Sequence, residues 1–183
     1  MAKSPSRTAD AVNRSWHISR TPEEIALTEL EYSLFRVFES FTRWQMECVA
    51  TAGVPNLSGA DAAILNVVRM RDRPKGISDI ARLLNRDDIA NLQYSLRKLT
   101  KAGLIEKAGH SAKKDVTYQV TSRGRGITEN YARIRAELLM PMVGSLADGR
   151  ADFDRGSRVL SLLTGMYDQA ARLAATYRPG PAE

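Results

Sequence analysis

The sequence contains few of the residues from which catalytic, metal and disulfide sites are built. It has one cysteine, Cys48, and two histidines, His17 and His110, which lie far apart in the chain. A single thiol excludes an internal disulfide framework, and neither histidine has a cysteine or carboxylate at ligand spacing. We also find no Ser-His-Asp set, no catalytic carboxylate pair and no phosphate-binding glycine loop. The sequence therefore predicts no enzyme activity, no metal ion and no cofactor.

Long apolar runs are absent as well. No run approaches the roughly 18 residues that cross a bilayer, and the polar start of the chain lacks the apolar core of a signal peptide. The 183 residues are 43% hydrophobic and 26% charged, which is ordinary for a globular protein. These features predict a cytoplasmic protein without membrane contact, built as one domain or as a small domain with dimerisation helices.

Charge is unevenly distributed along the chain. The formal net charge is +6, but residues 69–125 hold 14 Lys and Arg against 6 Asp and Glu, and the remaining residues hold 13 against 15. A solvated surface usually mixes its signs, so this basic segment favours a polyanionic partner. Charge alone fits DNA, RNA and an acidic membrane surface equally well.

The basic segment includes two short helical patterns. Ser78 and Asp79 are expected to cap the first helix, and Asp87 and Asp88 to begin the second. Apolar residues of the second helix recur at intervals of three and four, at Ile89, Leu92, Leu96 and Leu99. This spacing buries one side of a helix and frees the other, and Gly103 is expected to end it.

Two predicted strands follow, over residues 104–107 and 116–120, and a polar basic tip over 109–115 joins them. Two helices followed by a basic hairpin have the layout of a winged helix-turn-helix. In that arrangement the second helix enters a DNA major groove and the hairpin reaches the backbone or minor groove.

Two segments carry a family resemblance. Residues 99–105, LTKAGLI, resemble the exit from the recognition helix of MarR-type regulators, and residues 120–125, VTSRGR, resemble the end of their wing. The sequence departs from the family at the wing, where Ala112 and Lys114 replace a frequent Asp and Arg. It departs again on the recognition helix, where Gln93 and Tyr94 replace a frequent Thr-Arg pair. The resemblance implies a homodimer that binds double-stranded DNA, and the departures concern which DNA sequence it prefers.

The candidate DNA contacts are the polar residues of the recognition helix and the basic residues of the wing. Amide side chains pair with adenine edges, and arginine pairs with guanine or phosphate. The alternative interpretation is a solvated helix face and hairpin tip. The candidates are Asn91, Gln93, Tyr94, Ser95, Arg97, Lys98, Lys113, Lys114, Arg123 and Arg125.

Long helices are predicted near both ends of the chain. The first begins at residues 21–24, where Thr21, Pro22 and Glu24 form a strong start signal, and the last runs from Asp152 to about Tyr177. Each carries a long apolar stripe at intervals of three and four, which favours a helical partner. The predicted organisation is a flexible arm (1–20), an N-terminal dimerisation helix (21–57), a winged helix-turn-helix (58–126), C-terminal dimerisation helices (127–178) and a tail (179–183).

Two further features are open to more than one interpretation. The resemblance implies that small aromatic effectors bind beside the long helices. Cys48 is a candidate redox residue, but its place on the apolar stripe favours a small core residue. The candidate effector pocket, for which plain core packing is the alternative, comprises Tyr32, Phe35, Trp44, Met140 and Met142.

The sequence thus predicts a mainly α fold with a small β-hairpin wing and long terminal dimerisation helices. Its predicted function is homodimeric transcriptional regulation through pseudo-palindromic double-stranded DNA, modulated by a small ligand or oxidant. The alternatives are a winged-helix module that binds protein and an architectural DNA binder without an effector. An enzyme built on a winged scaffold is a further alternative, for which the sequence offers no acid-base set.

Overall fold

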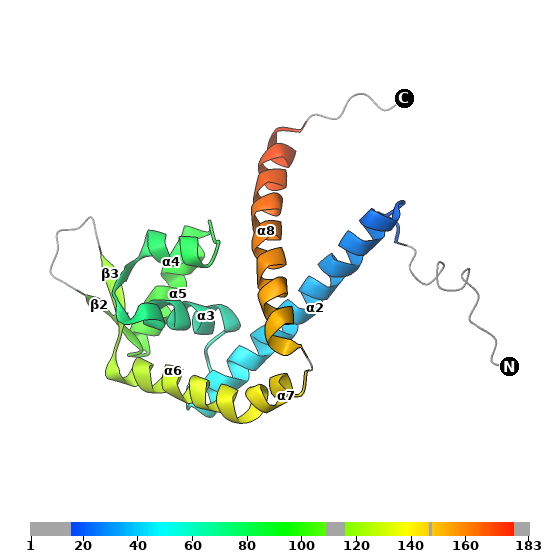
Figure 1. Ribbon diagram of the computed structural model, residues 1–183. Coiled ribbons are helices and arrows are strands. Elements are labelled where there is room, and N and C mark those ends of the chain that lie inside the picture. Colours follow the sequence, from blue (N-terminus) through cyan, green and yellow to red (C-terminus); the bar gives the residue numbers. More distant parts are fainter. Residues whose placement is uncertain (1–15, 109–115, 147, 178–183) are drawn as a thin grey trace. The chain divides into compact units, whose positions relative to one another are not determined.

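The computed structural model describes residues 16–108, 116–146 and 148–177. The chain divides into two compact units, residues 1–132 and 133–183. Helices make up most of the described chain, and the strands form one small sheet in the first unit (Figure 1). The predicted fold class, mainly α with a small β-hairpin wing, is confirmed.

The first unit opens with the long helix α2 (Pro22–Thr51), whose start is the one predicted. The Glu24 amide donates to Thr21 Oγ1 at 3.3 Å, and the Thr21 amide donates to Glu24 Oε2 at 3.0 Å, which completes a capping box. Gly53, at φ +82°, ends the helix in the left-handed region. Much of the apolar stripe is uncovered in the single chain, because Phe35 and Phe38 are 72% and 65% exposed.

The winged helix-turn-helix comprises α3 (Gly59–Arg69), α4 (Ile77–Leu83), α5 (Ile89–Lys101), β2 (Ile105–Ala108) and β3 (Thr117–Val120). Gly103 ends α5 with φ +69°, as predicted. A third strand, β1 (Lys75–Gly76), pairs antiparallel with β3 and gives the order β1-β3-β2. The sequence did not predict β1 because two residues without a β-branched side chain leave no periodic pattern.

The predicted cap of the first helix is wrong, whereas the predicted start of the second is correct in position. Helix α4 begins at Ile77 with Gly76 as its N-cap, so Ser78 and Asp79 lie inside the helix. Asp88 does occupy the N-cap position of α5, but its side chain makes no capping hydrogen bond. Arg86 holds that carboxylate instead, with nitrogen–oxygen distances of 2.7 and 2.5 Å.

The core of the first unit lies between the three helices and the sheet. The largest fully buried apolar side chains come from α3, α4, α5 and the residues that lead into β2: Ile64, Leu65, Ile80, Leu92, Leu96, Leu99, Leu104 and Ile105. Three of the four residues on the predicted face of α5 are therefore core residues. Ile89, the fourth, is 39% exposed, because it stands at the first position of the helix.

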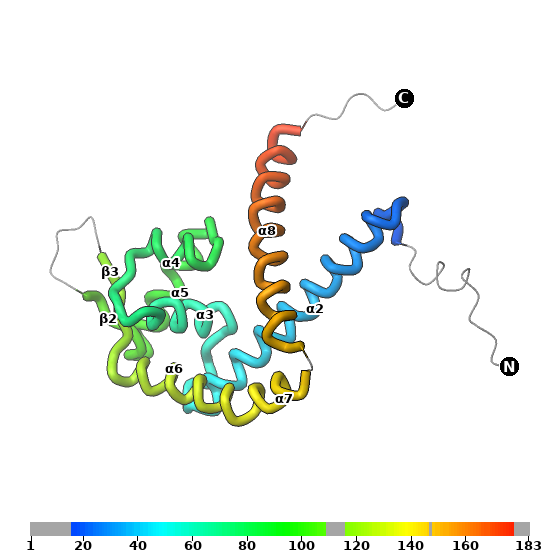
Figure 2. Tube along the Cα trace, viewed as in Figure 1, coloured from blue at the N-terminus to red at the C-terminus, as the bar shows by residue number. Residues whose placement is uncertain are grey.

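After β3 the chain enters α6 (Ser122–Ile134) directly at Thr121, a path that Figure 2 traces. A π-helical turn over Arg135–Leu139 and the short helix α7 (Met140–Gly144) follow. The widened turn lies just before Pro141, which lacks an amide hydrogen and crowds the preceding turn, so the predicted interruption takes this form. The last helix, α8 (Gly149–Thr176), begins three residues earlier than predicted.

Candidate nucleic-acid interface

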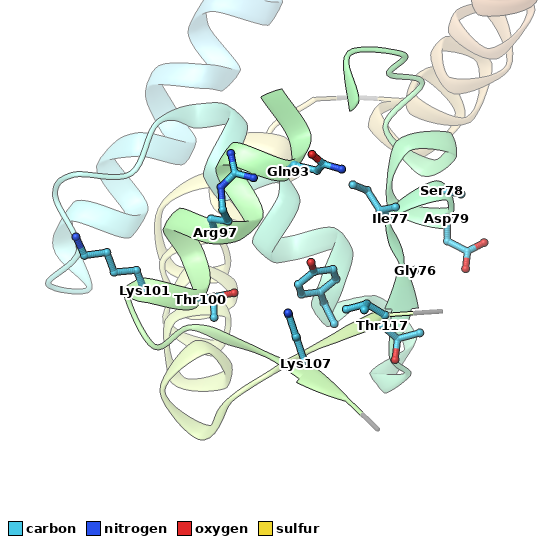
Figure 3. Close-up of a pocket in the computed structure, with 12 residues that line it drawn as sticks. Gly76, Ile77, Ser78, Asp79, Gln93, Arg97, Thr100, Lys101, Lys107 and Thr117 are labelled. Atoms are coloured by element: carbon cyan, nitrogen blue, oxygen red, sulfur yellow. The ribbon is translucent and has the colours of Figure 1, made fainter. Parts of the chain in front are cut away.

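A groove of about 1030 Å³ is bounded by the start of α4, one side of α5 and the sheet. Figure 3 shows the side chains that reach it from these three elements. They are Ile77, Ser78 and Asp79 from α4; Gln93, Arg97, Thr100 and Lys101 from α5; and Lys107, Thr117 and Tyr118 from the sheet. A groove between a recognition helix and a wing is where a winged helix-turn-helix admits the DNA backbone.

The groove is electropositive. Arg97, Lys101 and Lys107 contribute three positive charges, against the single carboxylate of Asp79. Arg82 Nη2 lies 2.7 Å from Asp79 Oδ1, and this partner holds the pKa of the Asp79 carboxyl below its usual value. The one negative charge is therefore ionised and already paired, so the groove attracts an anion as a whole.

Helix α5 presents two different polar faces. Gln93 and Arg97 are exposed on the face that lines the groove, and Tyr94, at 63% exposure, lies beside them. Arg97 makes no hydrogen bond or ion pair within the described part of the chain. These three predicted contacts are thus accessible to a ligand, and the amide and guanidinium groups are of the kind that reads base edges.

The other polar face of α5 turns toward α3, and here the sequence prediction of an outward face was wrong. Ser95 is only 7% exposed and its hydroxyl bonds to the carboxylate of Asp61. Lys98 Nζ lies 2.6 Å from Asp61 Oδ2, and the Asp61 side chain is 3% exposed. The buried Ser95 and the partly exposed Lys98 therefore both hold α5 on α3.

Asp61 is the centre of this contact. It completes the capping box of α3 by accepting from the Ser58 amide at 2.9 Å. Burial by itself raises the pKa of the Asp61 carboxyl, but hydrogen bonds from Lys98, Ser58 and Ser95 outweigh it and place the pKa below its usual value. The group is thus a buried, ionised carboxylate that joins two helices.

Three further predicted contacts are engaged within the chain. Asn91 Nδ2 donates to Asp88 Oδ2 at 3.2 Å at the start of α5. Arg123 Nη1 donates to the Ala102 carbonyl at 2.8 Å, and Arg125 Nη1 lies 3.1 Å from Asp72 Oδ1. All three side chains are exposed, so they retain donors toward solvent, but their positions are set by these partners. Lys113 and Lys114 lie outside the described residues.

Of the residues that line the groove, sequence reasoning named only Gln93 and Arg97 as contacts, and those that it missed include Thr100, Lys101, Lys107 and Thr117. The helical period was the available signal for the first two, because Gln93, Arg97, Thr100 and Lys101 fall on one side of a helix. The same period separates Ser95 and Lys98 from that side. Lys107 and Thr117 belong to strands whose pairing brings them next to α5, which no local pattern indicates.

The other candidate sites remain predictions. Cys48 is 2% exposed, and burial, followed by the nearby charge of Glu47, raises the pKa of its thiol, which favours the core interpretation. Trp44 packs against Tyr131 with ring centroids 6.5 Å apart, and its buried indole nitrogen has no partner among the described residues. Tyr32 and Phe35 in the first unit, and Met140 and Met142 in the second, are each at least 40% exposed.

Neither a metal site nor a membrane-spanning helix is found in the described parts of the chain. No group of three or more His, Cys, Asp or Glu side chains comes together there in a way that could hold a metal ion. None of the described helices is both long and apolar enough to span a bilayer.

Comparison with known proteins defines the class. Residues 57–124 match the family model of a winged helix DNA-binding domain. This range covers α3 to the first turn of α6, which is the segment that forms the groove. The chain therefore contains a winged-helix DNA-binding domain.

The fold around that domain is also known. A MarR family transcription regulator superposes with a TM-score of 0.64 at 15% identity, covering 82% of this chain and 95% of that one. The mutant MarR from E. coli complexed with operator DNA superposes with a TM-score of 0.59 at 18% identity, covering 74% of this chain and 95% of that one. The regulator MOSR from M. tuberculosis in complex with DNA superposes with a TM-score of 0.59 at 14% identity, covering 76% of this chain and 96% of that one. No curated protein matches in sequence. The chain has the MarR fold, in agreement with the sequence resemblance.

Proposed function

We propose that this protein is a homodimeric transcription regulator of MarR type that binds pseudo-palindromic double-stranded DNA. The observation that carries the proposal is the electropositive groove beside α5, lined by Gln93, Arg97, Lys101 and Lys107 within a winged-helix DNA-binding domain. Two proteins of similar fold were solved with DNA. In this proposal α5 enters a major groove, and the wing, with Lys113 and Lys114, contacts the flanking backbone or minor groove.

Dimerisation is supported by apolar side chains that a single chain leaves uncovered. On α2, Phe35, Phe38 and Phe41 are at least 50% exposed, and on α8, Leu162 and Met166 are more than 60% exposed. Uncovered apolar stripes on two long helices are characteristic of a helical interface. A two-fold dimer would present two copies of α5, and successive major grooves on one face of DNA recur about every 34 Å.

Modulation by a small ligand is the second part of the proposal. In the first unit, Trp44 has a buried indole donor without a partner among the described residues, and Tyr32 and Phe35 offer exposed apolar surface. In the second unit, Met140 and Met142 are exposed. A ligand would act by binding one spacing of the two recognition helices better than another. Ligand screening by the change in DNA affinity tests this part separately.

Selection of bound sites from a random duplex pool tests the proposal directly. We expect enrichment of a pseudo-palindrome whose half-sites lie about one helical turn apart, or about 10 base pairs. Comparable affinity for unrelated duplexes would instead identify an architectural DNA binder. No duplex binding at low salt would favour the protein-interaction module, because that module does not need the basic groove.

A further inference from the structure

The end of the recognition helix is held by the first turn of the helix that follows the wing. Three successive carbonyls, those of Ala102, Gly103 and Leu104, accept hydrogen bonds from that turn. Arg123 Nη1 donates to Ala102 at 2.8 Å, and Thr121 Oγ1 donates to Gly103 at 2.7 Å. The Thr121 amide donates to Leu104 at 3.1 Å.

A helix cannot satisfy its own last carbonyls, so the donors have to come from elsewhere. At the end of α5 two of them are satisfied locally: Leu104 N donates to Leu99 O at 3.0 Å and Gly103 N to Thr100 O at 2.9 Å. The carbonyls of Ala102, Gly103 and Leu104, which follow the helix, accept from Thr121 and Arg123. A guanidinium is well suited to this place, because the carboxyl end of a helix carries partial negative charge.

The backbones approach each other closely at the same point. A Cβ atom built on Gly124 would lie 1.9 Å from the Leu104 carbonyl oxygen, so no side chain fits there. At the next position in the chain, Arg125 pairs with Asp72, which belongs to the turn between α3 and β1. Helix α6 is thus tied to the winged domain at adjacent positions in its first turn.

We propose that Thr121, Arg123 and Gly124 form a joint that sets the orientation of α5 relative to α6, with Arg123 acting as a positioning residue rather than a phosphate contact. This inference rests on the proposed function of α5 as the recognition helix. Hydrogen bonds to base edges require a defined angle, whereas attraction to phosphates tolerates small rotations. Loosening the joint therefore affects specific binding and leaves non-specific binding unchanged.

The first test compares Arg123→Met, which keeps the apolar stem and removes the donor, with Arg123→Lys, which keeps a donor. Affinity is measured by fluorescence anisotropy on a selected and a random duplex at several salt concentrations. Arg123→Met should weaken binding to the selected duplex by roughly 3- to 10-fold, which corresponds to the net contribution of one ordinary hydrogen bond, because the exposed site screens the charge. Affinity for the random duplex and the salt dependence should stay as in the wild type, and Arg123→Lys should restore at least half of the specificity.

Lys101→Met serves as the matched control, because Lys101 is an exposed cation of the groove on the same helix end. It should weaken binding to both duplexes and lower the slope of affinity against salt concentration by about one unit for each phosphate that the variant no longer neutralises. If Arg123→Met behaves in this way instead, Arg123 is a phosphate contact and the joint is refuted.

A second measurement does not depend on DNA. Amide hydrogen exchange at Gly103 and Leu104 should accelerate roughly 3- to 10-fold in Arg123→Met and return toward wild type in Arg123→Lys. Unchanged exchange would refute the joint even if DNA binding changed. Accelerated exchange in a protein that binds no duplex would support the joint and refute the proposed function.

Discussion

The contact between Asp61 and Lys98 gives the sharpest test of which basic residues of α5 meet DNA. The sequence alone placed Lys98 on the DNA-reading face, whereas in the structure its ammonium lies 2.6 Å from a carboxylate that is 3% exposed. We expect Lys98→Met to destabilise the fold and to leave the salt dependence of DNA binding nearly unchanged.

The magnitude follows from what the substitution leaves behind. Removing one partner of a buried ion pair costs about 3–5 kcal/mol, because the other charge stays buried. Here the Lys98 side chain is 33% exposed, and Asp61 keeps its hydrogen bonds from Ser58 and Ser95, so screening and remaining partners reduce the cost. We expect about 1–3 kcal/mol for Lys98→Met. Asp61→Ala should cost about 2–3 kcal/mol, because it also removes the cap of α3.

The assay is urea unfolding at one fixed protomer concentration, since the stability of a dimer depends on concentration. A double-mutant cycle with Asp61→Asn and Lys98→Met should give a coupling energy of about 1–2 kcal/mol at pH 7. The coupling should also depend on pH. The Asp61 pKa is lowered in the folded protein, so its contribution is present above the unfolded value of 3.8 and is lost as pH falls through the lower folded value.

Two results would refute this reasoning. One is a Lys98→Met protein whose free energy of unfolding is within about 0.5 kcal/mol of wild type, as for an ordinary surface substitution. The other is a drop of about one unit in the salt slope per subunit, which is the effect expected when a side chain that neutralises a phosphate is removed. Arg97→Met is the matched control, because Arg97 is exposed in the groove and should show that drop without destabilisation.

Three other predictions follow from the same structure. Lys75 is 2% exposed, and its ammonium donates to the carbonyls of Val68, Met70 and Arg73. Lys75→Met should therefore lower the free energy of unfolding by about 2–4 kcal/mol. An unchanged urea midpoint would contradict this prediction. Phe38→Glu should shift sedimentation toward the 20.3 kDa monomer, because it places a charge on the proposed interface; a dimer of wild-type stability would exclude α2 from that interface. Mild peroxide should leave DNA affinity unchanged in wild type and in Cys48→Ser alike, because the Cys48 thiol is buried with a raised pKa; loss of affinity in wild type alone would establish a redox role.

Much of the fold could be predicted because it depends on local sequence patterns. The Thr21–Glu24 capping box, the apolar spacing of α5 and the glycine stop at Gly103 each appear where the sequence indicated. These signals depend on residues within one or two turns of each other. Strand β1 could not be found in this way, because its two residues become a strand only by pairing with β3.

The candidate site was harder to predict because its polar residues have partners that are distant in sequence. Lys98 meets Asp61 across 37 residues and Arg125 meets Asp72 across 53. A sequence shows that a lysine or arginine is present, but not whether a carboxylate on another helix already holds it. Counting basic residues therefore indicates the basic domain, but it does not show that Lys98 and Arg125 are paired with carboxylates within the chain.

The positions of these partners explain how α5 can be fixed within the domain while its groove side stays accessible to a ligand. Charged groups hold it at its start, through Arg86–Asp88, and in and just after its last turn, through Lys98–Asp61 and Arg123–Ala102. None of these pairs lines the groove, where Gln93, Arg97 and Lys101 stand. A helix that is held before binding loses less conformational freedom when it binds, so more of the contact energy appears as affinity. In the proposed function, the basic residues held within the chain would contribute to recognition by fixing the orientation of the groove residues.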